Sequence, residues 1–213
     1  MQKYLIIVLL ALFVNKQVVS QNVTYNPEIL LGHRAYNYQH KVGSELNQYF
    51  TITNIVVYDT EYDKDRKAIY FLRNTVSYNF HKHFSIAIGL GLKNPGAFTT
   101  ISGGYNFKSK DFSLVYALGT TYQNHFTLET FLLVEYTPKI GNTLYGLIKF
   151  QVSGNFKIDN YQINLKEFER GIQQFRLGLN KGNGQFGFAA NFDQFSNSNI
   201  SLFNLGIFYK HNF

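Results

Sequence analysis

The last eleven residues of the chain alternate between apolar and polar side chains. One set of alternate positions is apolar and aromatic: Phe203, Leu205, Ile207, Tyr209 and Phe213. The opposite set is mostly polar or small, with Phe208 as the exception, and His211 interrupts the apolar set. A period of two predicts a β-strand with one apolar and one polar face. An open, half-apolar strand is an aggregation hazard, whereas a strand that closes a barrel in lipid is not.

Nine further segments share this alternation and are separated by turn-forming residues. The cleanest runs from His83 to Leu92, where Phe84, Ile86 and Ile88 oppose small residues such as Ser85 and Ala87. Each segment is long enough for a tilted strand to cross a bilayer. The ten predicted strands are 49–58, 68–80, 83–92, 97–107, 112–122, 125–137, 143–156, 172–180, 185–195 and 200–213.

These segments, together with the aromatic final strand, resemble the outer-membrane β-barrel proteins of Gram-negative envelopes. The resemblance implies an antiparallel up-and-down transmembrane barrel of about ten strands, with eight or twelve as alternatives. It also implies contact with outer-membrane lipid and an assembly machinery that reads the final strand through Phe203, Leu205, Ile207, Tyr209 and Phe213. Both termini then face the periplasm, and the two longest connections, 59–67 and 157–171, lie outside as candidate surfaces for a partner.

The first 46 residues divide into two parts. Residues 1–20 have the features of a signal peptide, namely Lys3, an apolar run from Tyr4 to Val14, and small residues before a cleavage site ahead of Gln21. We therefore expect export and an outer-membrane location. Residues 21–46 are predicted to be an N-terminal arm or an extra strand, because Gly32 and its neighbours interrupt the alternation, and residues 47–213 are assigned to the barrel.

Composition adds two constraints. The chain has no cysteine, so backbone pairing and packing alone must hold an exported protein together. Its formal net charge is +7, or +5 once Lys3 and Lys16 leave with the signal, and the basic residues are spread over turns and strand ends. Because no basic stripe is formed, nucleic acid is not an expected partner.

Seven charged residues fall on the predicted inward faces of the strands. They would line a polar pore or, in a narrow barrel, form internal ion pairs that fill the lumen. The near balance of acids and bases favours ion pairs. The seven are Arg73, Glu129, Glu135, Lys149, Arg176, Asp193 and Lys210.

No enzymatic, metal or cofactor site is predicted. A His83-Phe84-Ser85 arrangement is similar to one in lipid A deacylases, but no carboxylate follows until Asp111. A barrel protease would need histidine beside acids at the outer rim, and His125 has no acid near it in sequence. We therefore expect a non-enzymatic barrel with a structural or surface-interaction role and a largely filled polar lumen. The alternatives are a small channel for passive solute passage and a secreted, soluble ligand-binding barrel.

Overall fold

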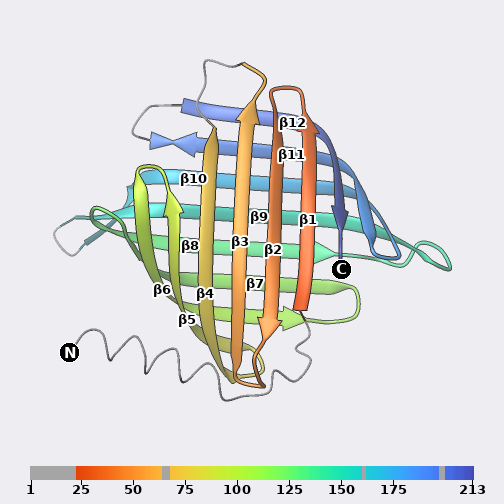
Figure 1. Ribbon diagram of the computed structural model, residues 1–213, viewed down its shortest axis with the longest axis horizontal. Helices are drawn as coiled ribbons and strands as arrows, with labels where there is room; N and C mark the ends of the chain where they lie inside the picture. Colours follow the sequence, from red (N-terminus) through yellow and green to blue (C-terminus); the bar gives the residue numbers. More distant parts are fainter. Residues whose placement is uncertain (1–22, 64–67, 160–161, 197–199) are drawn as a thin grey trace, which may run out of the picture.

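The computed structural model describes residues 23–63, 68–159, 162–196 and 200–213, so the predicted signal peptide lies outside the described residues. The described chain forms twelve β-strands in one closed antiparallel barrel (Figure 1). The strands are β1 Val23–Gly32, β2 Ala35–Glu45, β3 Phe50–Glu61, β4 Ile69–His81, β5 Phe84–Lys93, β6 Gly96–Lys108, β7 Phe112–Tyr122, β8 Phe126–Tyr136, β9 Leu144–Asp159, β10 Gln162–Lys181, β11 Gly184–Phe195 and β12 Ile200–His211.

Each strand pairs with its sequence neighbours, and β1 closes the barrel against β12. The closing ladder has five registered pairs, from Glu28 with Lys210 to Gly32 with Gly206. By comparison, the β11–β12 ladder has twelve pairs. The closure of the barrel is therefore a short seam.

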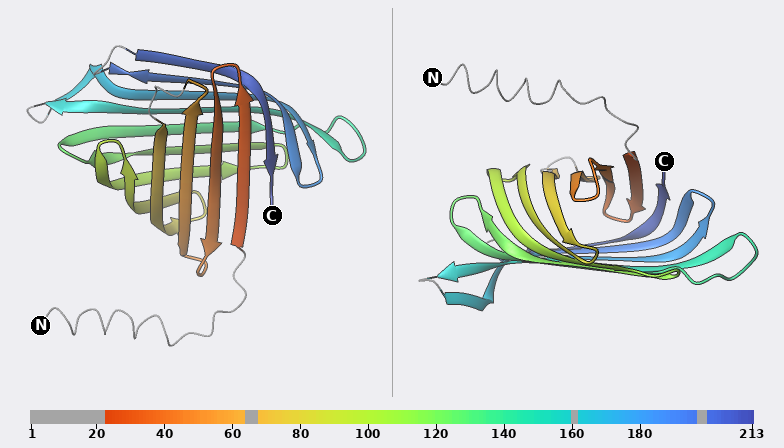
Figure 2. Two further views of the ribbon diagram at one scale, coloured as in Figure 1. Left: turned by 45° about the horizontal axis from the view of Figure 1, so that its top comes forward. Right: turned by 90° about the horizontal axis from the view of Figure 1, so that it is seen from below.

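The barrel has two walls that cross each other. In Figure 1, β1 to β4 run steeply across β7 to β12 behind them. Figure 2 shows the latter strands as a broad curved sheet facing the former. A circular barrel of twelve strands is wider than the eight-stranded barrels whose side chains fill the interior. Crossed, facing walls bring side chains from opposite strands together.

The two faces of each strand differ as the alternation predicts. The outward face carries large, exposed apolar side chains, such as Ile88 (59% exposed), Leu90 (61%) and Phe188 (66%). The inward face of β5 carries Ser85, Ala87 and Gly89. An outward apolar surface of this kind is typical of barrels that meet hydrocarbon. The described residues contain no helix with the length and apolar character needed to cross a membrane.

The prediction of an antiparallel up-and-down barrel is confirmed, but the favoured count of ten strands is wrong. The structure has twelve, because residues 23–45 form β1 and β2 rather than an arm or a single extra strand. Gly32, which interrupts the alternation, ends β1, and Ala35 begins β2. The residues that break the pattern therefore form a tight turn between two strands.

The predicted long loop at 157–171 is also largely strand. β9 continues to Asp159 and β10 begins at Gln162, which makes β10 a strand of 20 residues. Their ladder shifts register between Ile163 and Phe168 and again between Phe168 and Arg170. Such bulges break the period of two, which explains why the alternation failed there. In the other long connection, β3 continues to Glu61, and residues 64–67 are not described.

Candidate functional site: the barrel lumen

All seven charged residues predicted to face the lumen lie on inward faces. The ladders set Arg73 beside Gly91, Glu135 beside Lys149, and Lys149 beside Arg176. Of the seven, only Arg73 and Glu129 form an ion pair with each other. Arg176 pairs instead with Glu28, in the segment predicted to be an arm.

The Arg176–Glu28 pair crosses the lumen from β10 to β1, which are three strands apart around the barrel. Arg176 Nε donates to Glu28 Oε1 at 2.8 Å, and Nη2 lies 2.8 Å from the same oxygen. The side chains are only 2% and 3% exposed. Nη1 donates to Asn191 Oδ1 at 2.8 Å, and Gln39 Nε2 donates to Glu28 Oε1 at 2.7 Å. A buried ion pair needs such additional hydrogen bonds, and this one has them from both walls.

An apolar cluster lies next to this pair in the lumen. It joins β1, β9, β11 and β12 through four side chains that are at most 4% exposed: Leu30, Leu147, Ala189 and Phe208. The Arg176 guanidinium carbon lies 5.7 Å from the centre of the Phe208 ring, in a cation–π position. Because β1 and β9 are not neighbours in the sheet, the cluster joins strands from different parts of the barrel wall.

A second ion pair crosses the lumen between β4 and β8. Arg73 Nη2 on β4 lies 2.6 Å from Glu129 Oε1 on β8, four strands away. Thr121 Oγ1 donates to the other oxygen of Glu129 at 2.5 Å. The Arg73 guanidinium carbon lies 5.0 Å from the centre of the Phe71 ring, which stacks on Phe98 at 5.5 Å. This pair is 24% and 14% exposed, so water reaches it more readily than the first.

A glycine makes room for the Phe98 ring. A Cβ built on Gly91 would lie 2.4 Å from the Phe98 ring, well inside van der Waals contact. The end of the ring therefore lies against the inner surface of β5, and Lys93 Nζ is 5.0 Å from the ring centre. The glycine-rich inner face of β5 thus accommodates an aromatic side chain from β6.

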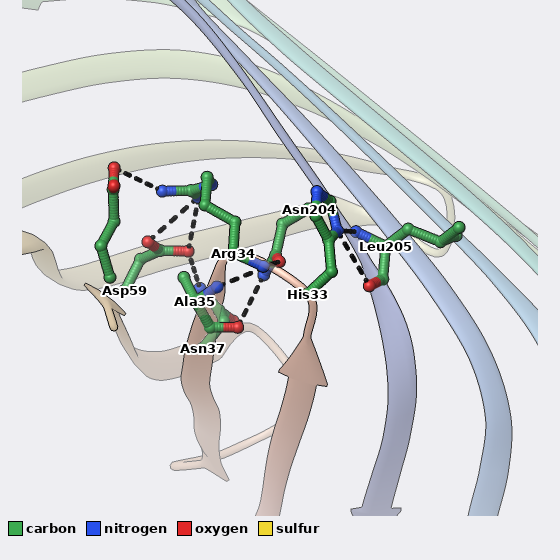
Figure 3. A network of polar contacts seen from close by, with 8 residues as sticks. His33, Arg34, Ala35, Asn37, Asp59, Asn204 and Leu205 are labelled. Carbon is green, nitrogen blue, oxygen red and sulfur yellow. Dashed lines mark hydrogen bonds and ion pairs between the residues drawn. The ribbon is translucent and has the colours of Figure 1, made fainter. Parts of the chain in front are cut away.

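The turn between β1 and β2 is held by a polar network at the barrel end away from the two termini, here called the distal end (Figure 3). Asn204 on β12 accepts from the backbone N–H groups of Arg34 and Ala35 at 3.1 and 3.2 Å and donates to the Ala35 carbonyl at 3.0 Å. The Arg34 guanidinium pairs with Glu61 at 2.7 Å and Asp59 at 3.3 Å. These contacts fasten β1 and β2 to β12 and β3, which strengthens the short seam at its distal end.

The opposite half of the lumen, towards the chain termini, is basic. Lys41, Lys149 and Lys210 come from β2, β9 and β12 and repel one another electrostatically. In the part of the chain that the structure describes, none of the three forms an ion pair with an acid. Glu135 and Glu28 attract Lys210 electrostatically, so these acids offset part of the repulsion among the three ammonium groups.

The structure also locates the histidines considered as enzymatic candidates. The sequence shows no acid near His125, but the fold brings it into hydrogen-bond contact with Glu169 of β10 at the distal end. His83 Nδ1 lies 2.9 Å from the Asn106 carbonyl oxygen, and Ser85 faces the lumen beside Gly104. Among the described residues, no group of three potential metal ligands comes together.

The predicted C-terminal signal residues face outward. Phe203, Leu205, Ile207, Tyr209 and Phe213 are all between 47% and 70% exposed. Phe213 stacks on Tyr25 of β1 at 5.7 Å, and its backbone N–H donates to the Tyr25 carbonyl at 2.9 Å. Phe213 therefore extends the contact between β1 and the C-terminal end of the chain beyond the five registered pairs of the seam.

The sequence matches no protein-family model and no curated protein. Solved structures do match. The COG4313 outer membrane channel from Pseudomonas putida F1 is 9% identical with a TM-score of 0.52, over 94% of this chain and 98% of that chain. LpxR from Salmonella typhimurium is 8% identical with a TM-score of 0.44, over 88% of this chain and 99% of that chain. The first likeness, together with the closed sheet, shows that this chain has the fold of the outer-membrane β-barrels.

Several luminal residues were missed by sequence analysis. Glu28, Lys41 and Asn204 were not assigned a role, although Glu28 and Asn204 make the most buried polar contacts of the seam region. A signal was present for Glu28, since it is an acid next to the apolar run Ile29-Leu30-Leu31. No local pattern marks Asn204, whose partners lie about 170 residues earlier in the chain.

Proposed function

We propose that this protein is an integral outer-membrane barrel with a lumen that is closed at rest, and that it acts through its outer surface. The observation that carries the proposal is the set of contacts between strands that are not neighbours. Arg176 with Glu28, Arg73 with Glu129, and Leu30 with its apolar cluster each span the interior. An open pore would instead present its charged side chains to a continuous water path.

In this proposal the distal end faces outward and presents the surface-interaction segments. With both termini in the periplasm, the external side holds the β9–β10 hairpin, which extends past its neighbours (Figure 2), and the end of β3. The His125–Glu169 and Arg34–Glu61 pairs lie on the same side. A surface partner would therefore meet residues 59–63 and the described parts of 157–171. The proposal includes no catalytic role.

Orientation is tested directly because the natural chain has no cysteine. Asn124→Cys places a thiol in an exposed distal turn, and Lys110→Cys places one in an exposed turn at the opposite end. A membrane-impermeant maleimide added to intact cells is expected to label the first variant alone. Labelling of Lys110→Cys alone would invert the proposed orientation, and labelling of neither would contradict surface display.

A specific observation favours the channel as a second candidate. Inward residues of β4, β5 and β7, such as Ser77, Ala87 and Ala117, are partly exposed, which fits a water-filled space beside the ion pairs. Ion flux into proteoliposomes separates the two candidates. We expect the ion flux through the wild-type protein to equal that of empty liposomes. The double variant Arg73→Ala/Glu129→Ala, which lacks one ion pair across the lumen, is expected to show a higher flux. Wild-type flux well above that of empty liposomes would favour the channel.

A further inference from the structure

A row of uncharged polar side chains crosses the outward face of β1 to β4. On the neighbouring strand β5, the outward positions are Ile86, Ile88, Leu90 and Leu92, all about half exposed or more. The row thus contrasts with the apolar outward face of β5. Its members come from four adjacent strands and are Tyr25, Tyr38, His40, Asn54 and Asn74.

The row is a continuous chain of hydrogen bonds. The Tyr25 and Tyr38 hydroxyls are 3.0 Å apart, and the Tyr38 hydroxyl is 3.0 Å from His40 Nδ1. His40 Nε2 is 3.2 Å from Asn54 Oδ1, and Asn54 Nδ2 donates to Asn74 Oδ1 at 2.8 Å. With the His40 proton on Nε2, every bond is donated in one direction, from Tyr25 towards Asn74.

The row ends in an exposed amide. Asn74 accepts through Oδ1, and among the described residues no hydrogen bond involves its Nδ2 group. His40 is the central residue of β2, and Asn74 is near the middle of β4. In a barrel embedded in a bilayer, these positions lie towards the hydrocarbon, where an amide without a partner is costly. A polar partner from outside the barrel would remove this cost.

The chemistry of the row selects the kind of partner. It contains no lysine, arginine or acid, so it offers no counter-charge to a lipid phosphate group. Amide and imidazole groups both donate and accept, so an identical row related by a two-fold axis is complementary to it. Two uncharged rows also meet without repulsion. The row begins on β1, next to the five-pair seam that a covering subunit would support.

We propose that the outward face of β1 to β4 is the interface of a homodimer in the membrane, with a second copy of this chain covering the row. The side-chain amides of Asn54 and Asn74 in one copy pair with the row of the other around a two-fold axis parallel to the membrane normal. The proposal does not depend on whether the lumen conducts. It needs only insertion of the barrel in lipid.

Single cysteines in the refolded full-length mature protein test this interface. Val76→Cys places a thiol on the outward face of β4, next to Asn74, and Phe188→Cys places a matched thiol on the outward face of β11. In proteoliposomes, oxidation is expected to give disulfide-linked dimers with Val76→Cys and not with Phe188→Cys. Equal cross-linking of both variants, or of neither, would overturn the proposal.

A second variant distinguishes dimerisation through the polar row from nonspecific lateral contact between barrels. Asn54→Leu with Asn74→Leu, made in the Val76→Cys background, keeps the outer surface apolar and leaves the lumen untouched. We expect about a tenfold weaker dimer, measured from the cross-linked fraction against the protein-to-lipid ratio. A heat-modifiable band identical to that of the parent shows that the barrel is folded. An unchanged dimer fraction in the folded variant would contradict a role for the row.

Discussion

Arg176 and Glu28 form a buried ion pair across the lumen although 148 residues separate them in the chain. Glu28 belongs to the first strand and Arg176 to the tenth, so the pair forms only when the barrel closes. Each side chain also has a hydrogen bond on its own side of the pair, since Glu28 accepts one from Gln39 and Arg176 donates one to Asn191. The pair therefore ties the closing strand to the opposite wall.

Removing one charge of this pair should destabilise the barrel strongly. Glu28→Gln leaves the Arg176 charge buried without its counter-charge, and we expect a loss of about 3 kcal/mol in the free energy of unfolding. Urea unfolding in lipid vesicles measures this. The control Glu45→Gln, at the exposed terminal end of β2, should change stability by less than about 0.5 kcal/mol. Equal effects of the two substitutions would mean that the pair is solvated.

Replacing both partners should restore most of that loss. Glu28→Leu with Arg176→Met substitutes apolar side chains of similar length beside the Leu30 and Phe208 cluster. Replacement of a whole buried pair by apolar residues is often neutral, so we expect the double variant to lie within about 1 kcal/mol of the natural protein. The same unfolding experiment on the single variants Glu28→Leu and Arg176→Met completes a double-mutant cycle. A double variant as unstable as Glu28→Gln would show that the hydrogen bonds to Gln39 and Asn191 dominate.

The outward face predicts the effect of a charge placed in lipid. Ile88 is 59% exposed in the middle of β5, and Ile88→Arg should cost about 2–4 kcal/mol if that position is near the bilayer midplane. Folding stability in vesicles is the measurement, and Asn94→Arg in the adjacent β5–β6 turn is the control. No effect at Ile88 would show that the face meets water, as in the soluble alternative.

Loss of the final aromatic residue should impair assembly. Deleting Phe213 removes both its stacking on Tyr25 and its backbone bond to the Tyr25 carbonyl. We expect a smaller fraction of folded, heat-modifiable protein in cell envelopes, with Phe213→Tyr as the control that keeps the ring. Normal assembly of the deletion would argue against a role for Phe213 as an assembly signal.

The fold was predictable from the sequence wherever the period of two is unbroken. The segment 112–122 coincides with β7, and the ten predicted strands correspond to β3 through β12. The first two strands were missed because the Gly32 turn was interpreted as a broken strand. The extension of β10 was missed because bulges around Phe168 shift the register. The alternation also left Phe208 unexplained, and the structure places it in the apolar luminal cluster.

The luminal partners were much less predictable than the strands. Alternation assigns Arg176 to the inward face, but its partner depends on how the walls cross, which no local pattern records. The same holds for Arg73 and Glu129, four strands apart. Facing directions are local properties of a strand, whereas cross-lumen contacts follow from the shape of the closed barrel.

Single-channel conductance of the refolded mature protein in a planar lipid bilayer tests the closed lumen most directly. Protease protection in parallel vesicles confirms insertion, and the Arg73→Ala with Glu129→Ala variant provides a version with one cross-lumen pair removed. The closed-lumen proposal predicts inserted wild-type protein without conductance steps. Steady, ohmic steps from the wild-type protein would contradict it and would make the luminal lysines Lys41, Lys149 and Lys210 candidates for ion selectivity.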